Sequence, residues 1–229
     1  MIMIYTHNDL EAVQIEMAIS TFCNARCRRC PRTNSDTGEH VDWLVPEHMP
    51  LETFKLILNS KHDGSSKLCR IQLCGEYGDP MMHPHIGEII DHVMSYENLG
   101  LVINTNGGIR NSKWYIELAK KYGQRIYIIF GIDGLDHETN WKYREGVEFD
   151  RAYANMTGFN TNDGGAAWQF LVFSWNVHQL EDVHKHAADI DIELKIIVDL
   201  EFAKTLDDTG LDELKNRFSN LGVDDYQGI

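Results

Sequence analysis

The sequence lacks any continuous apolar stretch of about 18 residues, the minimum for a membrane-spanning helix. Its first residues, MIMIYTHNDLEAVQ, also lack the basic segment, apolar segment and cleavage site of a secretory signal. Basic residues are few, because 21 Lys and Arg stand against 35 Asp and Glu, and the formal charge is −14. This charge argues against bulk binding to nucleic acid. We therefore expect a cytoplasmic protein with no membrane partner.

Cysteine is scarce, with five in 229 residues, and none follows Cys74. In a chain without a secretory signal, closely spaced cysteines more often bind metal or carry out redox chemistry than form disulfides. Three of the five, Cys23, Cys27 and Cys30, lie in the short segment TFCNARCRRCPR. The other two, Cys69 and Cys74, lie in a strand-like apolar stretch, where free cysteine behaves as a small hydrophobic residue.

Apolar runs rich in Ile, Val and Phe alternate along the chain with amphipathic segments of helical period. This alternation is typical of repeated βα units and a parallel sheet. Six strands are predicted, over 14–20, 70–74, 101–105, 125–132, 168–173 and 193–198. Helices are predicted over 51–58, 86–96, 113–122, 150–157, 180–188 and 211–221. Because the strands look apolar on both faces, we expect helices or a barrel interior to cover each side.

No internal repeat, low-complexity block or Gly/Ser-rich linker divides the chain. We therefore predict one folded unit, with a core over 1–199 and a short helical tail over 200–229 packed on it. Two long connections, 31–50 and 134–149, follow predicted strands. Loops of this length in a compact α/β protein are more often site walls than spacers, and α/β folds place their chemistry at the carboxyl ends of strands.

Cys23, Cys27 and Cys30 have the spacing CxxxCxxC directly after the first predicted strand. Thiolates this close together can bind zinc or an iron–sulfur cluster. A structural zinc site needs four protein ligands, and the next candidate, His40, lies ten residues further on without the usual spacing. A [4Fe–4S] cluster held by three cysteines would leave one iron open to bind a cofactor.

This motif, after the first strand of a chain with six βα units, resembles the radical S-adenosylmethionine (radical SAM) superfamily. The resemblance implies a partial (β/α)6 barrel of parallel strands with outer helices, a cluster on Cys23, Cys27 and Cys30, and SAM chelated by the open iron. A flavodoxin- or ferredoxin-like donor would supply one electron, and the 5′-deoxyadenosyl radical would abstract a hydrogen atom from the substrate. Such an enzyme is expected to be oxygen-sensitive.

One departure lies inside the motif, where the family usually has an aromatic residue before the third cysteine. This chain has Arg29 there. A cation at this position could alter the environment of the cluster or point to solvent, and the sequence leaves both interpretations open.

Two further motifs at strand ends fit the same resemblance. In LCGEYGDPMMHPH, Gly75 and Glu76 match the family's GGE motif, whose backbone and carboxylate bind the SAM ammonium group, and Cys74 replaces its first glycine. In INTNG, Thr105 and Asn106 match a TNG motif that faces the SAM ribose and methionine. These four matching residues are predicted to bind SAM.

The segment IYIIFGIDGLDHETNWKYREG resembles the S-I-D-G and Y-R-x-G of the branch that contains molybdenum-cofactor synthesis and peptide-modifying (SPASM/twitch-type) enzymes. Gly131 replaces a serine that binds ribose hydroxyls in that branch. Asp133 is predicted to hold a ribose diol or polarise the substrate, and Arg144 to pair with the SAM carboxylate through two parallel hydrogen bonds. Gln169 could face the barrel interior and touch ribose or substrate. The side chain of Asn176 is expected to do no more than cap the helix that follows it.

The resemblance covers about residues 16–199, and 200–229 contain no cysteine for an auxiliary cluster. The sequence thus predicts a radical SAM enzyme with one cluster that acts on a peptide, a protein or a small molecule. Two alternatives remain open. One is a degenerate relative that binds SAM without radical chemistry, and the other is a zinc-stabilised binding module built from the three cysteines and a histidine.

Overall fold

The computed structural model of the chain describes residues 2–6, 13–34, 36–61, 68–75, 77–221 and 226–227. They form one eight-stranded sheet in which the strands lie in sequence order. The strands are β1 (Ile2–Thr6), β2 (Val13–Met17), β3 (Leu68–Leu73), β4 (Gly100–Thr105), β5 (Ile126–Gly131), β6 (Gly165–Val172), β7 (Glu193–Val198) and β8 (Tyr226–Gln227). β1 is antiparallel to β2, and every other neighbouring pair is parallel.

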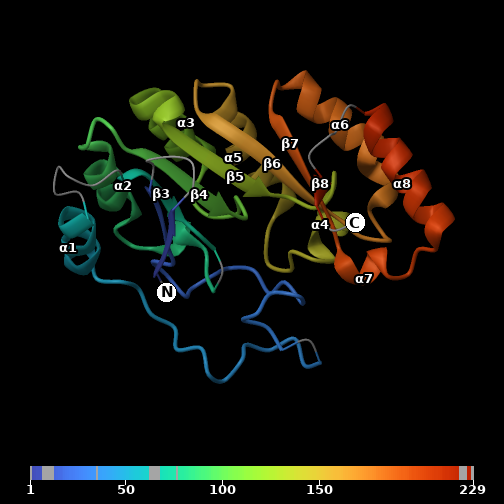
Figure 1. Cartoon of the computed structure of the whole chain (residues 1–229), viewed down its shortest axis with the longest axis horizontal. Helices are drawn as coiled ribbons and strands as arrows, with labels where there is room; N and C mark the ends of the chain where they lie inside the picture. Colours follow the sequence, from blue (N-terminus) through green and yellow to red (C-terminus); the bar gives the residue numbers. More distant parts are fainter. Residues whose placement is uncertain are drawn as a thin grey trace.

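Helices connect the successive parallel strands. The longer ones are α1 (Leu51–Lys61), α2 (Ile86–Met94), α3 (Ser112–Tyr122), α5 (Phe149–Asn160), α6 (Leu180–Asp189) and α8 (Asp208–Asn220). The short ones are α4 (His137–Trp141), α7 (Leu200–Ala203) and the 3-10 turns η1 (Pro80–Met82), η2 (Gly123–Arg125) and η3 (Val177–Gln179). In Figure 1, α3, α5 and α6 lie along the upper side of the sheet, and the blue segment between β2 and α1 runs along the lower side.

The predicted alternation of six parallel strands with helices is confirmed, since β2 to β7 each overlap a predicted strand. β1, β8, α4 and α7 are additions that the sequence pattern did not predict. α4 and α7 have five and four residues, which is too short to show a helical period. β8 has only two residues.

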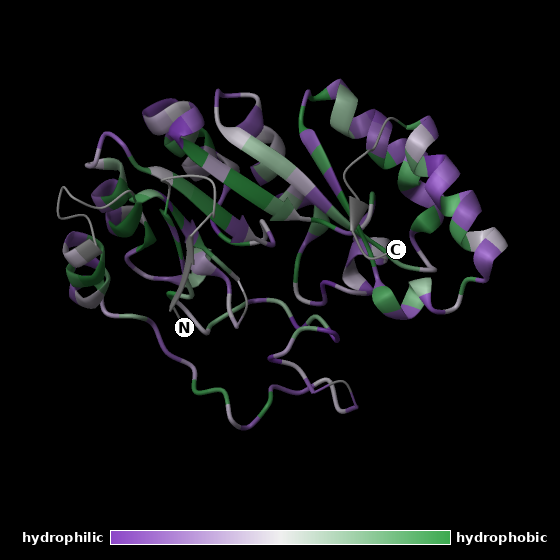
Figure 2. Ribbon diagram, in the orientation of Figure 1, coloured by the Kyte–Doolittle hydropathy of each residue, from purple (hydrophilic) through white to green (hydrophobic). Residues whose placement is uncertain are grey.

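The hydrophobic core lies between the sheet and the helices. α2 shows how the pattern positions a helix, because Ile86, Ile89, Ile90 and Val93 recur at helical spacing and are fully buried. Strand residues that face the helices, such as Phe130, are equally buried. Figure 2 shows β4 and β5 as mostly hydrophobic and α8 as mostly hydrophilic.

The expectation that the strands are apolar on both faces is wrong. Glu16, Gln72, Asn104 and Gln169 lie on the side away from the helices and are only partly buried. Gln72 accepts a hydrogen bond from Gln14 at 2.7 Å and donates one to Asn104 at 3.1 Å, so amides link β2, β3 and β4. This concave face is polar because it lines the cavity, and the described helices α2, α3, α5 and α6 pack on the other face.

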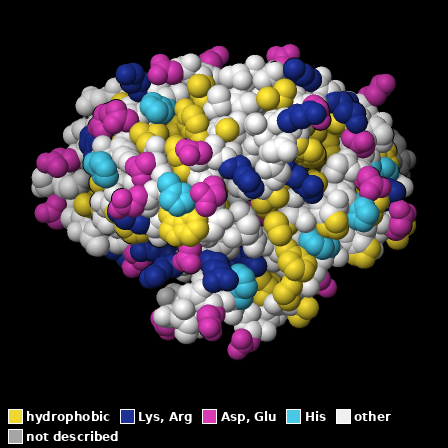
Figure 3. All heavy atoms as spheres, turned by 180° about the vertical axis from the view of Figure 1, so that it is seen from behind, with side chains coloured by type: hydrophobic (Ala, Val, Ile, Leu, Met, Phe, Trp, Pro, Cys, Tyr) yellow, Lys and Arg dark blue, Asp and Glu magenta, His cyan; other side chains and the backbone are white. Residues whose placement is uncertain are grey.

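The described part of residues 200–229 packs on the rest of the sheet and helices. Leu214 and Phe218 of α8 belong to the main hydrophobic core. Arg217 of α8 donates hydrogen bonds to Glu181 and to the Val177 carbonyl oxygen. Among the described residues, no helix has both the length and the hydrophobicity needed to cross a membrane. Acidic, basic and hydrophobic side chains are interspersed over the rear face (Figure 3).

Candidate functional site

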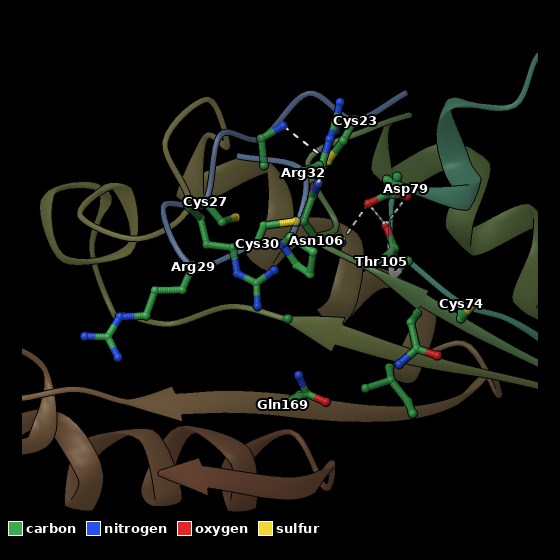
Figure 4. A pocket seen from close by; sticks show the side chains of 18 of the residues that line it. Cys23, Cys27, Arg29, Cys30, Arg32, Cys74, Asp79, Thr105, Asn106 and Gln169 are labelled. Carbon is green, nitrogen blue, oxygen red and sulfur yellow. Dashed lines mark hydrogen bonds between the residues drawn. The ribbon is translucent and has the colours of Figure 1, made fainter. Parts of the chain in front are cut away.

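A cavity of about 460 Å³ lies at the carboxyl ends of the central strands. Eight of the ten residues predicted for the site line it: Cys23, Cys27, Cys30, Gly75, Thr105, Asn106, Arg144 and Gln169. Figure 4 shows the three cysteines on one wall, on the loop after β2, and Gln169 on the opposite wall, on β6. Of the other two, Glu76 lies outside the described residues. Asp133 is described but does not line the cavity.

The three thiols share the cavity wall and differ in exposure. Cys27 is buried, and Cys23 and Cys30 are partly buried. Burial raises the pKa of the Cys27 thiol to about 12 and also raises the pKa of the Cys23 thiol. Binding of a metal centre would therefore release protons from these two thiols.

The cysteine loop is held in shape by two other loops. The Arg26 N–H donates to the Glu145 carbonyl at 2.8 Å, and the Asn24 side chain donates to the Gly146 carbonyl at 3.3 Å. Asn106 donates to the Asn24 side-chain oxygen at 2.8 Å and to the Cys23 sulfur at 3.5 Å. Gly146 has φ +94°, and a Cβ there would lie 2.4 Å from the Asn24 carbonyl oxygen, so this contact requires glycine.

Asp79 is a buried carboxylate of the cavity wall that the sequence reading missed. It accepts hydrogen bonds from the Thr105 hydroxyl and from the backbone N–H groups of Met81 and Asn106, at 2.9 to 3.0 Å. Burial raises its pKa, which these hydrogen bonds oppose. The signal was present in the sequence, because Asp before Pro80 is typical of a helix start.

The glycine before it, Gly78, is required by a close backbone approach. A Cβ on Gly78 would lie 2.3 Å from the Ser20 carbonyl oxygen and 2.8 Å from that of Phe22. The turn after β3 is thereby pressed against the start of the cysteine loop. This contact brings Asp79 into the same wall as Cys23.

Arg144 lines the cavity, and Asp133 lies behind it. The Asp133 carboxylate is fully buried and accepts hydrogen bonds from Arg144 Nε at 2.6 Å and from the Leu171 N–H at 2.7 Å. Burial disfavours the charged guanidinium, but Asp133 more than offsets it and raises the pKa of Arg144. A Cβ on Gly131 would lie 2.5 Å from Arg144 Nη2, so the position that carries serine in the resembling branch is occupied here by the guanidinium.

Asn176 does not serve as a cap, because its side chain makes no capping hydrogen bond to η3. It accepts from the Phe173 N–H at 2.7 Å and donates to the carbonyl oxygens of Asp133 at 3.0 Å and Leu171 at 2.8 Å. The interpretation of Asn176 as only a helix cap is therefore wrong. Its amide joins the ends of β5 and β6 under the Asp133–Arg144 pair.

The donor set does not have the geometry of a single-ion site. Among the described ranges, no three His, Cys, Asp or Glu side chains come close enough together to hold one metal ion. His40, the candidate fourth zinc ligand, is exposed and pairs through its backbone with Thr33. The three thiols instead face a shared cavity from one loop, which suits a cluster in which each cysteine binds a different iron.

Comparison with known protein families matches residues 17–162 to the Radical SAM superfamily. The chain belongs to this superfamily. Radical SAM enzymes use a [4Fe–4S] cluster and SAM, and these are therefore the cofactors of this enzyme. Comparison with curated proteins gives no match.

Solved structures with a similar fold are radical SAM enzymes. SuiB of Streptococcus suis bound to S-adenosylmethionine has a TM-score of 0.66 and 16% identity over 93% of this chain and 46% of SuiB. anSMEcpe with bound AdoMet gives 0.61 and 17%, over 80% of this chain and 50% of that one. Methylornithine synthase (PylB) gives 0.52 and 15%, over 81% and 52%.

These identities establish the fold alone, and the chain spans about half the length of the structures it matches. The predicted partial barrel of parallel strands with outer helices is thereby confirmed. The resemblance to the radical SAM superfamily is confirmed by the family match.

Arg29, the departure inside the radical SAM motif, has partners away from the cysteines. Its guanidinium pairs with Asp199 at the end of β7 and lies 5.8 Å from the centre of the Phe173 ring. Figure 4 shows the side chain extending away from the three thiols. The charge of Arg29 is thus balanced by a carboxylate of the protein.

Proposed function

We propose that this chain cleaves SAM reductively and uses the 5′-deoxyadenosyl radical to abstract a hydrogen atom from a substrate in the cavity. The observation that carries the proposal is the loop on which Cys23, Cys27 and Cys30 face one cavity at the carboxyl ends of the strands. When bound there, the cluster and SAM supply the electron transfer and the radical. The residues of the chain supply ligands, orientation and exclusion of water.

In this proposal the three cysteines hold a single cluster and leave one iron for SAM. Asn106 stabilises the Cys23 thiolate, because its amide N–H already points at that sulfur at 3.5 Å. The electron comes from a flavodoxin- or ferredoxin-like partner.

The groups that orient SAM are proposed to have opposite charges. Asp79, whose buried carboxylate is on the cavity wall beside Cys23, is proposed to bind the ammonium group together with Glu76. Arg144 takes the SAM carboxylate with Nη1 and Nη2, while Asp133 holds Nε and sets the plane of the guanidinium. Thr105 acts through Asp79, to which its hydroxyl donates.

The substrate is proposed to be a peptide or a polar small molecule. The concave face that completes the cavity carries Glu16, Gln72, Asn104 and Gln169, which suits a substrate with hydrogen-bonding groups. A similar fold binds a peptide, since SuiB has been solved bound to the precursor peptide SuiA.

Reductive cleavage of SAM tests the proposal. Protein reconstituted without oxygen should be brown, contain about four irons per chain and release 5′-deoxyadenosine from SAM when a strong one-electron donor is added. Cys27→Ala should abolish this release, whereas Cys69→Ala should not, because Cys69 is exposed and does not line the cavity. Colourless protein with one zinc would favour the zinc module, and a full cluster without 5′-deoxyadenosine would favour the degenerate relative.

Deuterium transfer tests the hydrogen abstraction. Labelled candidate peptides and small molecules are incubated with loaded enzyme, SAM and reductant, and the 5′-deoxyadenosine is analysed by mass spectrometry. Incorporation of deuterium identifies both the substrate and the carbon that is attacked. If SAM is cleaved and a candidate is converted without any transfer of label from it, abstraction from that candidate is refuted.

A further inference from the structure

Arg32 is a buried cation of the cavity wall, two residues after Cys30. Its side chain lines the cavity, and the residue is only 5% exposed. Nε and Nη1 are shielded from solvent and have no hydrogen-bond partner among the described residues. The backbone of Arg32 is fixed, because its carbonyl oxygen accepts from the Val41 N–H at 3.0 Å. The guanidinium is thus held in the wall without a counter-ion from the described chain.

The other two arginines of the cavity wall differ from Arg32 in this respect. Arg29 pairs with Asp199, and Arg144 pairs with Asp133. A guanidinium cannot shed its proton in a protein, so burial without a partner cannot be relieved by neutralisation. A buried charge is tolerated when it is paired, and the unpartnered N–H groups of Arg32 therefore point to an anion that enters the cavity.

Cys23 lies beside Arg32 in the cavity wall. Both side chains line the cavity, and Figure 4 shows them next to one another. When the three cysteines hold a cluster, their thiolates make this wall anionic. The negatively charged cluster would then be the counter-ion that Arg32 lacks.

We propose that Arg32 binds the anionic cluster, with its guanidinium N–H groups donating hydrogen bonds to sulfur on the Cys23 side and its charge stabilising the reduced state. One electron enters the cluster from the external donor, and the reduced cluster carries one more negative charge than the oxidised cluster. A fixed cation beside it therefore raises its reduction potential. Arg32 is a positioning and tuning residue, and the inference rests on the proposed function only in needing a cluster on the three cysteines.

A redox titration tests this role without using SAM cleavage as the readout. Wild type, Arg32→Gln and Arg32→Lys are reconstituted, and the reduced cluster is quantified by electron paramagnetic resonance at set potentials in the absence of SAM. Arg32→Gln should lower the equilibrium constant for reduction about tenfold, which is about 59 mV for one electron. Arg32→Lys, which keeps the charge, should recover most of this loss.

Arg28→Gln is the matched control, because Arg28 lies in the same loop, is exposed and does not line the cavity. Its potential should stay at the wild-type value, since solvent and salt screen an exposed charge. If Arg32→Gln binds no cluster but Arg32→Lys does, the charge at position 32 is needed to hold the anionic cluster, which supports the proposal. Failure of both variants to load would assign Arg32 a packing role and overturn it.

Equal potentials for Arg32→Gln and Arg28→Gln would also overturn the proposal. This outcome is separate from failure of the proposed function, because the potential is measured before SAM is added. A wild-type protein that holds a cluster but releases no 5′-deoxyadenosine would refute the proposed function. The role of Arg32 would then be decided by the redox titration alone. A wild-type protein that cannot hold a cluster would refute both.

Discussion

Removal of the Asp133 carboxylate should destabilise the protein strongly, because it leaves the Arg144 guanidinium buried without its partner. Asp133 is fully buried, and the Arg144 side chain is 15% exposed. Breaking such a pair by removing one member costs about 3–5 kcal/mol. For a chain of this size, that loss corresponds to a fall in melting temperature of roughly 6–20 °C.

The matched control is Glu181→Ala. Glu181 pairs with Arg217 at 2.7 Å, but the two side chains are 55% and 33% exposed. Loss of an exposed pair typically changes the free energy of unfolding by about 1 kcal/mol or less. The comparison therefore keeps the chemistry of the pair and varies its burial.

Urea denaturation followed by circular dichroism measures both variants of the metal-free protein. The double variant Asp133→Ala/Arg144→Met should regain part of the lost free energy of unfolding, since replacing both members removes the unpaired charge. The reasoning would be refuted if Asp133→Ala lost no more stability than Glu181→Ala. It would also be refuted if the double variant were no more stable than Asp133→Ala.

Three further outcomes are expected. Gly131→Ser, which restores the serine of the resembling branch, should cost about 1–3 kcal/mol, because its Cβ would lie 2.5 Å from Arg144 Nη2 and the hydrogen bond to Asp133 holds the guanidinium in place; a denaturation midpoint equal to wild type would contradict this. Asn176→Asp should cost about 1–3 kcal/mol by leaving the Asp133 and Leu171 carbonyl oxygens without a donor, whereas unchanged unfolding would show that water replaces the amide. Burial lowers the pKa of His83 below 6.5, so its neutral form is favoured in the folded state and stability should fall as the pH drops from 6.5 through the lower folded pKa. Melting temperatures measured from about pH 7 to 5 should decline less steeply for His83→Gln than for wild type, and parallel curves would exclude this role.

The parts of the fold that the sequence predicts are those set by local pattern. The helical spacing of Ile86, Ile89 and Ile90 can be recognised without knowing their neighbours in space. In the same way, the residues of 193–198 alone predict a strand. The cysteines were equally visible, because three ligands on one loop need only their spacing to be recognised. These features do not depend on which segment becomes the neighbour of which.

The features that the sequence did not reveal depend on tertiary contacts. Asp79 became a site residue only through its contacts with Thr105 and Asn106, on the next strand end. The sequence predicts that Asp133 and Arg144 each contact SAM or substrate. In the structure they form a hydrogen-bonded ion pair with one another. The polar concave face escaped prediction because Glu16 and Gln72 alternate with apolar neighbours in strands too short to show the pattern clearly.

The hydrogen bond from the Asn24 side chain to the Gly146 carbonyl oxygen links two positions that are 122 residues apart. A chain that has emerged from the ribosome only as far as Arg32 already carries every thiol of the motif, but it has none of the later loop that shapes them. We therefore expect iron and sulfide to be delivered to a domain that has finished folding. An isolated peptide bearing the motif would then be a poor guide to how tightly the whole protein retains its iron.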